Sequence, residues 1–388
     1  MARAELLDRL RELQPTTSRA GARIFFAPGR ANLLGAHLDY NGGSVMPVAL
    51  SRGTYLAVAP RTDRLLSLRS AQFPGEAVEL PLDELRPRRT RAWTAYLEGA
   101  LWACEQAWGR LPGLDLALVA DLPMARGLSS SASVECVAVF ACARLLGRET
   151  EPDEMIHLAH RAENLYVGVR CGILDQAAIL LGRPGHLLLF DCLEMTREHL
   201  PLPAGLRLVV VDSGVQRELA TSAFNQRVAE CTRALAELQQ VAPGLTCLRD
   251  VDRDLLERHG DRLAPILRRR VEHVVGEVER TERGAAALRA GRGEEFGRMM
   301  TAAHDSLRDL FEVSTPELDA LVEAAVAVSG CLGARLTGAG FGGCIVGLVA
   351  AGAEDAFEAA VADAYRRRCG REAEFHWFDP GGGPAEIA

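Results

Sequence analysis

A glycine- and serine-rich stretch, Gly-Leu-Ser-Ser-Ser-Ala-Ser at residues 127–133, constrains this chain more than any other segment. It follows an apolar run at 114–120 that predicts a strand and precedes a run at 133–146 that predicts a helix. Glycine lets the backbone approach a ligand closely, and serines at a helix start lie beside free N–H groups and the positive end of the helix dipole. The stretch therefore predicts a phosphate-binding turn. On these residues alone, an ordinary serine-capped helix after a tight turn is an open alternative.

The basic residues narrow the ways in which the chain can hold a phosphate. The sequence contains no lysine, so all 44 basic residues are arginines. A lysine-bearing GxxxxGK(S/T) loop and lysine Schiff-base chemistry are thereby excluded. Arginines, backbone amides and a metal ion would have to neutralise any phosphate. The formal net charge of −8 argues against a general nucleic-acid-binding role.

Length and cysteine content set the broad class of protein. The 388 residues are enough for about two domains with a substantial core. The ten cysteines include no CxxC pair, which is typical of reduced thiols in a cytoplasmic protein. Residues 1–19 lack an apolar signal core, and no run approaches the roughly 20 apolar residues that span a bilayer. We therefore expect no membrane partner, and the sequence leaves the oligomeric state open.

A second polar segment lies at residues 27–43, where four candidate functional side chains, Arg30, Asn32, His37 and Asp39, are punctuated by glycines. It follows a predicted strand at 24–26 and precedes two more at 45–50 and 54–59. Polar groups at this density between strands are typical of a loop over a site. The alternative is a polar hairpin loop with a solvated aspartate.

A third segment, residues 161–176, carries two carboxylates twelve residues apart, Glu163 and Asp175. A helix at 153–167 followed by a glycine turn could aim both at one cavity, where one would hold a metal while the other takes a proton. His157 and His160 are spaced as metal ligands could be, but we expect surface histidines because no third ligand is apparent.

Two further segments complete the pattern. Trp93 begins a predicted helix at 93–108 and could cover an adenine ring, although these residues favour a core aromatic. The glycine-rich turn at 336–344 leads into a strand at 345–349, which excludes a dinucleotide-binding fingerprint because that motif needs a helix there. A boundary near 201–203 divides the chain into domains at 1–200 and 201–388, and the second is mostly helical. Its helices are expected at 218–242, 265–282, 294–310 and 316–329.

Taken together, these segments resemble the galactokinase family of the GHMP small-molecule kinases. Residues 29–43 are similar to the family's sugar signature, GRVNLIGEHTDYNGG, and residues 123–132 to its ATP loop, PxGxGLSSSA. Residues 171–176 are similar to CGIMDQ, and residues 336–344 match LTGAGFGGC. The resemblance implies an α+β fold of two domains with the active site between them. It also implies phosphoryl transfer from ATP to the anomeric hydroxyl of a sugar.

The same resemblance implies roles for individual residues. Asp175 would accept or orient the proton of the C1 hydroxyl, and Arg30 would stabilise charge on the transferred phosphoryl group. Ser131 and Glu163 match the Mg²⁺ ligands, a hydroxyl and a carboxylate that suit a hard cation. The sugar-binding positions are Ala36, His37, Leu38, Asp39, Gly172 and Phe224. The ATP-binding positions are Trp93, Ala125, Arg126, Gly127, Leu128, Ser129, Ser130 and Ser131.

Three departures from the family pattern bear on the substrate. Ala36 stands where galactokinases carry glutamate, Phe224 where they carry a tyrosine facing the sugar, and Ala125 where the ATP loop has glycine. The glutamate would accept a hydrogen bond from a C6 hydroxyl and would repel a C6 carboxylate. The sequence GAHLDYNGG is similar to the galacturonokinase branch, which also carries GAH. Galactose and galacturonate are therefore the two leading substrates.

Two other classes of function are open. Some proteins of this family sense sugar and ATP as regulators with little catalysis, but the four residues Arg30, Ser131, Glu163 and Asp175 argue against that class. A GHMP kinase for a mevalonate-like or homoserine-like acceptor is the second, and the His37-x-Asp39 pattern argues against it.

Overall fold

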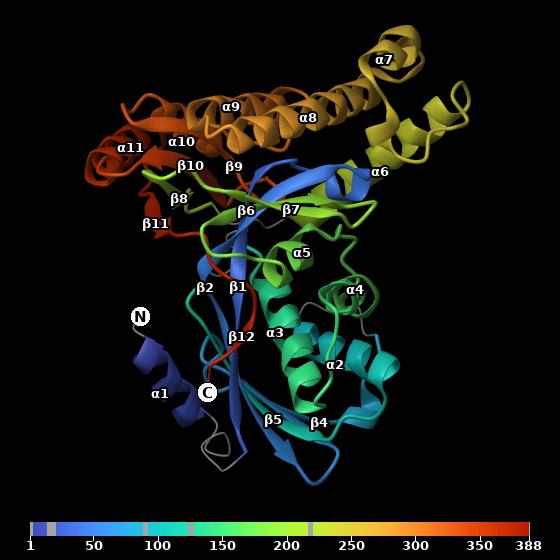
Figure 1. Ribbon diagram of the computed structural model, residues 1–388, viewed down its shortest axis with the longest axis vertical. Coiled ribbons are helices and arrows are strands. Elements are labelled where there is room, and N and C mark those ends of the chain that lie inside the picture. Colours follow the sequence, from blue (N-terminus) through green and yellow to red (C-terminus); the bar gives the residue numbers. More distant parts are fainter. Residues whose placement is uncertain (1–2, 14–20, 88–91, 123–127, 216–219, 388) are drawn as a thin grey trace.

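The protein is built around two β-sheets and is described by a computed structural model over residues 3–13, 21–87, 92–122, 128–215 and 220–387 (Figure 1). The first sheet has eight strands in the order β12-β1-β2-β5-β3-β4, with a β6–β7 hairpin attached to β2. Its strands are β1 (Arg23–Leu34), β2 (Ser44–Arg61), β3 (Leu65–Ser70), β4 (Ala77–Pro81), β5 (Gly113–Ala120), β6 (His186–Asp191), β7 (Arg197–Pro201) and β12 (Ala385–Glu386).

The second sheet is antiparallel in the order β11-β8-β10-β9. Its strands are β8 (Leu206–Asp212), β9 (Cys331–Leu336), β10 (Cys344–Ala350) and β11 (Glu374–Phe378). Alternate residues of β8 enter different core clusters, Val209 and Val211 on one face and Leu208 and Val210 on the other. Both faces are therefore covered, which explains why residues 208–211 of β8 are all apolar instead of alternating with polar residues.

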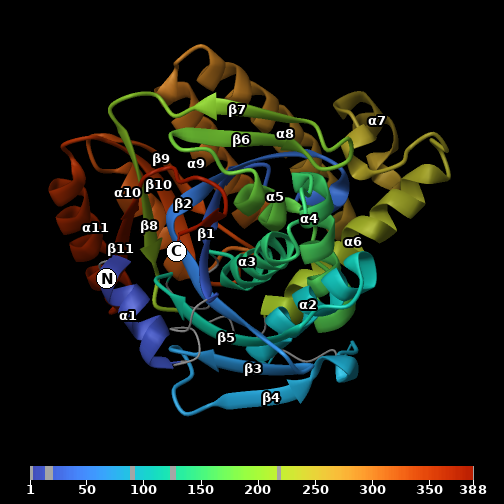
Figure 2. The ribbon, with the colours of Figure 1, turned by 60° about the horizontal axis from the view of Figure 1, so that its bottom comes forward.

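The helices cover the sheets in layers. Against the first sheet, α1 lies on one face and α2 to α5 lie on the other (Figure 2). Beyond the second sheet, α8 and α9 run side by side along the top of Figure 1. The helices are α1 (Arg3–Leu13), α2 (Thr94–Trp108), α3 (Ser130–Leu145), α4 (Pro152–Arg161), α5 (Leu174–Leu180), α6 (Ala220–Gln239), α7 (Arg253–His259), α8 (Pro265–Arg289), α9 (Gly293–Asp309), α10 (Pro316–Val326) and α11 (Glu354–Cys369). Across the described ranges, no helix is both long and apolar enough to cross a membrane.

The polar segment at 27–43 differs from the expectation of a loop in its first half. Strand β1 continues through Arg30 and Asn32 to Leu34 and pairs with β2. Register shifts between Pro28 and Arg30 and between Asn32 and Leu34 let the strand bend without leaving the sheet. The two strands expected at 45–50 and 54–59 are likewise one strand, β2. Polar side chains on one face of a strand gave the same local pattern as a polar loop.

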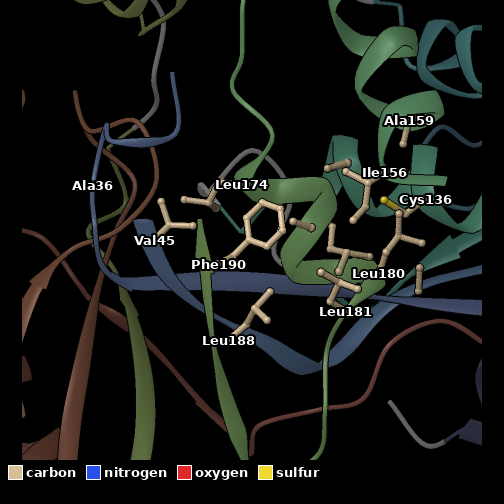
Figure 3. Close-up of a cluster of buried hydrophobic side chains, with 14 of the residues drawn as sticks. Ala36, Val45, Cys136, Ile156, Ala159, Leu174, Leu180, Leu181, Leu188 and Phe190 are labelled. Atoms are coloured by element: carbon tan, nitrogen blue, oxygen red, sulfur yellow. The ribbon is translucent and has the colours of Figure 1, made fainter. Parts of the chain in front are cut away.

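Helix α5 is a short platform held by the core. Its residues Leu174 and Leu180, with Leu181 just beyond its end, belong to the same buried cluster as Leu188 and Phe190 of β6 (Figure 3). Each such side chain contributes about 1.5–3 kcal/mol on burial. The helix therefore cannot shift without opening the core, and its first turn is a rigid support for Asp175.

Most of the expected helices are confirmed within a few residues, including those at 93–108, 133–146, 294–310 and 316–329. Helix α10 shows the local reason: the Thr315 side chain accepts a hydrogen bond from the Leu318 N–H, and Pro316 occupies the first turn. The helix expected at 153–167 is an α-helix followed by one turn of π-helix, Ala162–Val167. Strand β12 returns to the first sheet, where Glu386 pairs with Phe25 of β1.

Candidate active site

One cavity of about 790 Å³ gathers the segments that the sequence singled out. Its walls come from β1, the turn after β1, the starts of α2, α3 and α5, helix α6 and the glycine-rich turn before β10. Among the lining residues are Arg30, Asn32, Ala36, His37, Asp39, Trp93, Ser129, Ser130, Ser131, Glu163, Cys171, Gly172, Asp175, Phe224, Gly338 and Ala339.

The Asp175 carboxylate is held from two sides. Arg30 Nε donates a hydrogen bond to Asp175 Oδ1 at 2.6 Å, and the Ser129 hydroxyl donates one to Oδ2. Ser129 caps α3 with a left-handed backbone, φ +55°, which costs a residue other than glycine energy and is found at functional sites. The two hydrogen bonds fix the plane of the carboxylate at the cavity wall.

The second carboxylate, Glu163, lies on the π-turn, a distortion that often marks functional residues. Its Oε1 accepts a hydrogen bond from the Ser131 hydroxyl at 3.3 Å. Its Oε2 accepts one from Gln176 Nε2 at 2.8 Å and one from the Cys171 thiol at 3.3 Å. Burial, followed by repulsion from Asp175, raises the pKa of Glu163. A cation placed between the Ser131 and Glu163 oxygens would relieve that cost.

These two oxygens fit Mg²⁺ because it takes a few protein oxygens and completes its shell with water and phosphate. Within the described ranges, no group of three or more His, Cys, Asp and Glu side chains is arranged to hold a metal by itself. The histidine pair does not offer another site. His157 is exposed, as expected, while His160 is half-buried and bonded through Nε2 to the Cys171 carbonyl.

The far end of the cavity has a flat aromatic wall. Trp93 and Phe73 are stacked with ring centroids 5.5 Å apart, and Trp93 Nε1 donates a hydrogen bond to Glu76. Both rings line the cavity, and Trp93 also packs against the core, so the two expectations for it are not exclusive. Phe73 was missed because its position in a turn carries no pattern. The wall suits a planar base. Leu128 is buried in the core instead of lining the cavity. The predicted ATP-binding positions Ala125, Arg126 and Gly127 lie outside the described residues.

His37 and Phe224 line another part of the cavity, and the rings of Tyr40 and Phe311 pack around His37. The His37 ring lies 4.7 Å from Phe311 and 5.8 Å from Phe224 between centroids, and its Nδ1 is 2.9 Å from the Tyr40 hydroxyl. Burial lowers the pKa of His37 well below its ordinary value, so the ring is neutral at physiological pH. The side chain of Leu38, a predicted sugar-binding position, is fully buried in the core and does not line the cavity.

Asp39 and Gly172 meet at the floor of this end. An added Cβ on Gly172 would lie 2.1 Å from Asp39 Oδ2, closer than any real contact. Burial, followed by repulsion from Asp175, raises the pKa of Asp39 from 3.8 to about 7. The site therefore contains one carboxyl group that is half-protonated near neutral pH.

The Asp39 pKa predicts a pH-dependent stability. The folded protein keeps this proton up to about pH 7 while the unfolded chain loses it near 3.8, so stability falls as the pH rises between these values. We expect Asp39→Asn to match the parent near pH 4 and to exceed it above pH 7 by at most about 4 kcal/mol. Calorimetric unfolding of both proteins across this range measures the difference. A difference that does not vary with pH would assign Asp39 an ordinary pKa.

The backbone at Ala36 is bonded to a buried cluster of charged side chains. The N–H groups of Gly35 and Ala36 donate to Glu277 Oε1 at 2.8 and 3.0 Å. Arg280 Nε donates to Glu277 Oε2 at 2.7 Å, and Arg335 Nη1 lies 3.7 Å from Oε1. Burial opposes ionisation of Glu277, but Arg280 and Arg335 outweigh it and lower its pKa. The sequence analysis missed this cluster, although a charged residue inside an apolar strand, as Arg335 is, signals a buried partner.

Family models match three parts of the chain. They are the N-terminal domain of GHMP kinases over residues 95–183, the galactose-binding signature of galactokinases over 15–60, and the C-terminal domain of GHMP kinases over 285–367. Among curated relatives, a galactokinase of Roseiflexus sp. (strain RS-1) is 44% identical, with 91% of this chain and 90% of the relative covered. A galactokinase of Bacillus subtilis (strain 168) is 38% identical, with 95% of each covered.

Two solved structures also match nearly the whole chain. The crystal structure of Lactococcus lactis galactokinase complexed with galactose matches with a TM-score of 0.94 at 33% identity, over 99% of each chain. The mevalonate kinase of Methanococcus jannaschii matches with a TM-score of 0.64 at 18% identity, over 94% of this chain and 100% of that one, and shares the fold.

Proposed function

The chain belongs to the galactokinase family of the GHMP kinases and is a sugar kinase, and we propose that it phosphorylates the anomeric C1 hydroxyl of galactose or of its C6 acid, galacturonate. The observation that carries the proposal is the arrangement of Asp175, Arg30 and the Ser131–Glu163 pair on one cavity wall. The aromatic end by Trp93 would take the adenine of ATP, and the His37 end would take the sugar.

Each residue on this wall would have its own role in phosphoryl transfer. Asp175 would orient the C1 hydroxyl and accept its proton, with its plane set by Arg30 and Ser129. The rest of the Arg30 guanidinium would stabilise negative charge on the transferred group. Ser131 and Glu163 would hold Mg²⁺, which supplies further neutralisation of the phosphates when bound.

At the sugar end, Asp39 and His37 would form hydrogen bonds with the sugar hydroxyls. Both residues reach the cavity from the turn after β1. The neutral His37 ring can donate or accept through its second nitrogen, Nε2, which is buried beside the backbone of Ala339. Phe224 contributes an apolar face without a hydroxyl of its own. This combination of polar groups and rings suits the two faces of a pyranose.

The charges behind Ala36 support galacturonate as a substrate. Burial lowers the pKa of Arg335 only to about 10 and that of His273 to about 4, so at neutral pH Arg335 is charged and His273 is neutral. Two arginines, Arg335 and Arg280, therefore face the single carboxylate of Glu277. A glutamate at position 36 would add a second negative charge near them, and alanine does not. Neither arginine lines the cavity, so a C6 carboxylate would be attracted to them at a distance and not through a direct contact.

An acceptor panel tests the proposal. ADP release is measured with ATP and Mg²⁺ on galactose, galacturonate, N-acetylgalactosamine, glucose and arabinose, and the product is identified as the 1-phosphate. We expect turnover on galactose and galacturonate and little on glucose. Turnover on galactose alone would exclude galacturonate as a substrate and leave the assignment as a sugar kinase unchanged. No turnover on any sugar would favour a sugar-sensing regulator, or an acceptor that is not a sugar.

Position 36 gives a sharper prediction. We expect Ala36→Glu to lower the kcat/KM ratio of galacturonate to galactose by about 1,000-fold, since two unit charges 4 Å apart repel by roughly 4 kcal/mol at an effective dielectric near 20. Ala36→Gln, with the same shape and no charge, is the matched control and is expected to change the ratio far less. If both variants keep the parent ratio, position 36 does not face C6.

A further inference from the structure

Asn32 lines the cavity without a role in the chemistry described so far. It lies on β1 two residues beyond Arg30, and alternate residues of a strand face the same side. Arg30, two residues before it, bonds Asp175, and Ala36 and His37 follow in the turn after β1. Along the chain, Asn32 therefore comes between the residues proposed for phosphoryl transfer and the position proposed to face C6.

The backbone N–H and carbonyl of Asn32 have hydrogen-bond partners, but its side-chain oxygen does not. The Asn32 N–H donates to Thr337 Oγ1 at 3.1 Å, and the Thr337 hydroxyl donates back to the Asn32 carbonyl at 3.4 Å. The side-chain Oδ1 is buried and has no hydrogen-bond partner among the described residues, and the whole residue is 4% exposed. A buried amide without a partner destabilises a protein, so such a group is retained where a ligand supplies the partner.

We propose that Asn32 is a specificity-determining residue whose carboxamide binds the acceptor sugar on its C5–C6 side. This inference rests on the proposed function. An amide carries an acceptor and a donor that exchange places when the group turns over. It can accept from the C6 hydroxyl of galactose through Oδ1 or donate to the C6 carboxylate of galacturonate through Nδ2. Asn32 thereby admits both sugars, where a glutamate at position 36 would admit one.

Two substitutions at Asn32 separate binding from structure. Asn32→Leu removes both polar groups at similar volume, so we expect the free protein to unfold at the same or a higher temperature. We expect the sugar KM to rise about tenfold, with the ATP KM unchanged. Asn32→Asp keeps the acceptor but loses the donor and adds charge, so galactose is retained while the kcat/KM for galacturonate falls at least tenfold.

The readouts are steady-state kinetics for both substrates and the shift in unfolding temperature on adding each sugar without ATP. A lower unfolding temperature for Asn32→Leu with an unchanged sugar KM would overturn the inference, because it would make Asn32 structural. An Asn32→Asp variant with the parent sugar ratio would overturn it as well. If the parent binds and phosphorylates no sugar, the proposed function and this inference fall together. If the parent does phosphorylate sugars, these two results overturn the Asn32 inference alone.

Discussion

Asp175→Asn is expected to lower kcat by about 10²–10⁴-fold while leaving ATP binding largely intact. Asparagine has the same shape and keeps an oxygen for Arg30 or Ser129, but it lacks the charge and basicity to orient and deprotonate the C1 hydroxyl. ADP release measures turnover, and calorimetric titration with ATP measures binding. Asp191→Asn is the matched control, since Asp191 pairs with Arg249 outside the cavity. Near-normal turnover in the Asp175 variant would remove Asp175 from the mechanism.

Gly172→Ala is expected to weaken sugar binding by at least about 100-fold, because the new methyl group would lie 2.1 Å from Asp39 Oδ2 and 2.4 Å from its Cγ. Asp39 or the turn before α5 has to move, and either displacement changes the floor of the sugar site. ATP binding at the Trp93 end should be retained. The shift in unfolding temperature on adding galactose measures the loss.

The control for Gly172 is Gly244→Ala, the same substitution at an exposed glycine whose added Cβ would meet no atom within 4 Å. It should leave both the sugar response and turnover unchanged. If Gly172→Ala binds sugar as the parent does, then Asp39 yields without cost and does not set the geometry of the site.

The sequence predicted the parts of the site that short motifs encode. Ser131 and Asp175 begin helices, Arg30 lies on a strand and Glu163 ends a helical run, and all four line one cavity. The same local reasoning misread β1, since polar residues on one face of a strand look like a loop until the paired strand is known. The local sequence pattern cannot distinguish a strand from a loop here, because the pairing with a distant strand decides between them.

Other features of the site depend on pairs far apart in the chain. The cluster behind Ala36 joins residues 35 and 36 to 277 and 335, and no periodicity connects such positions. Trp93 shows a related limit, because an aromatic ring at a helix start gives the same pattern whether its faces meet the core, a cavity or, as here, both. Its stacking partner, Phe73, lies in a separate turn that no pattern connects to it.

Strand β12 bears on how the protein is made. Residues 385 and 386 complete the edge of the first sheet beside β1, and Arg23 holds Glu386 there through two hydrogen bonds of 2.6 Å. During translation β1 emerges early, so its outer edge waits unpaired while nearly all the remaining residues are added. An open strand edge is a template for pairing with other chains. The outer edge of β1 is therefore open to pairing with other chains until residues 385 and 386 are in place.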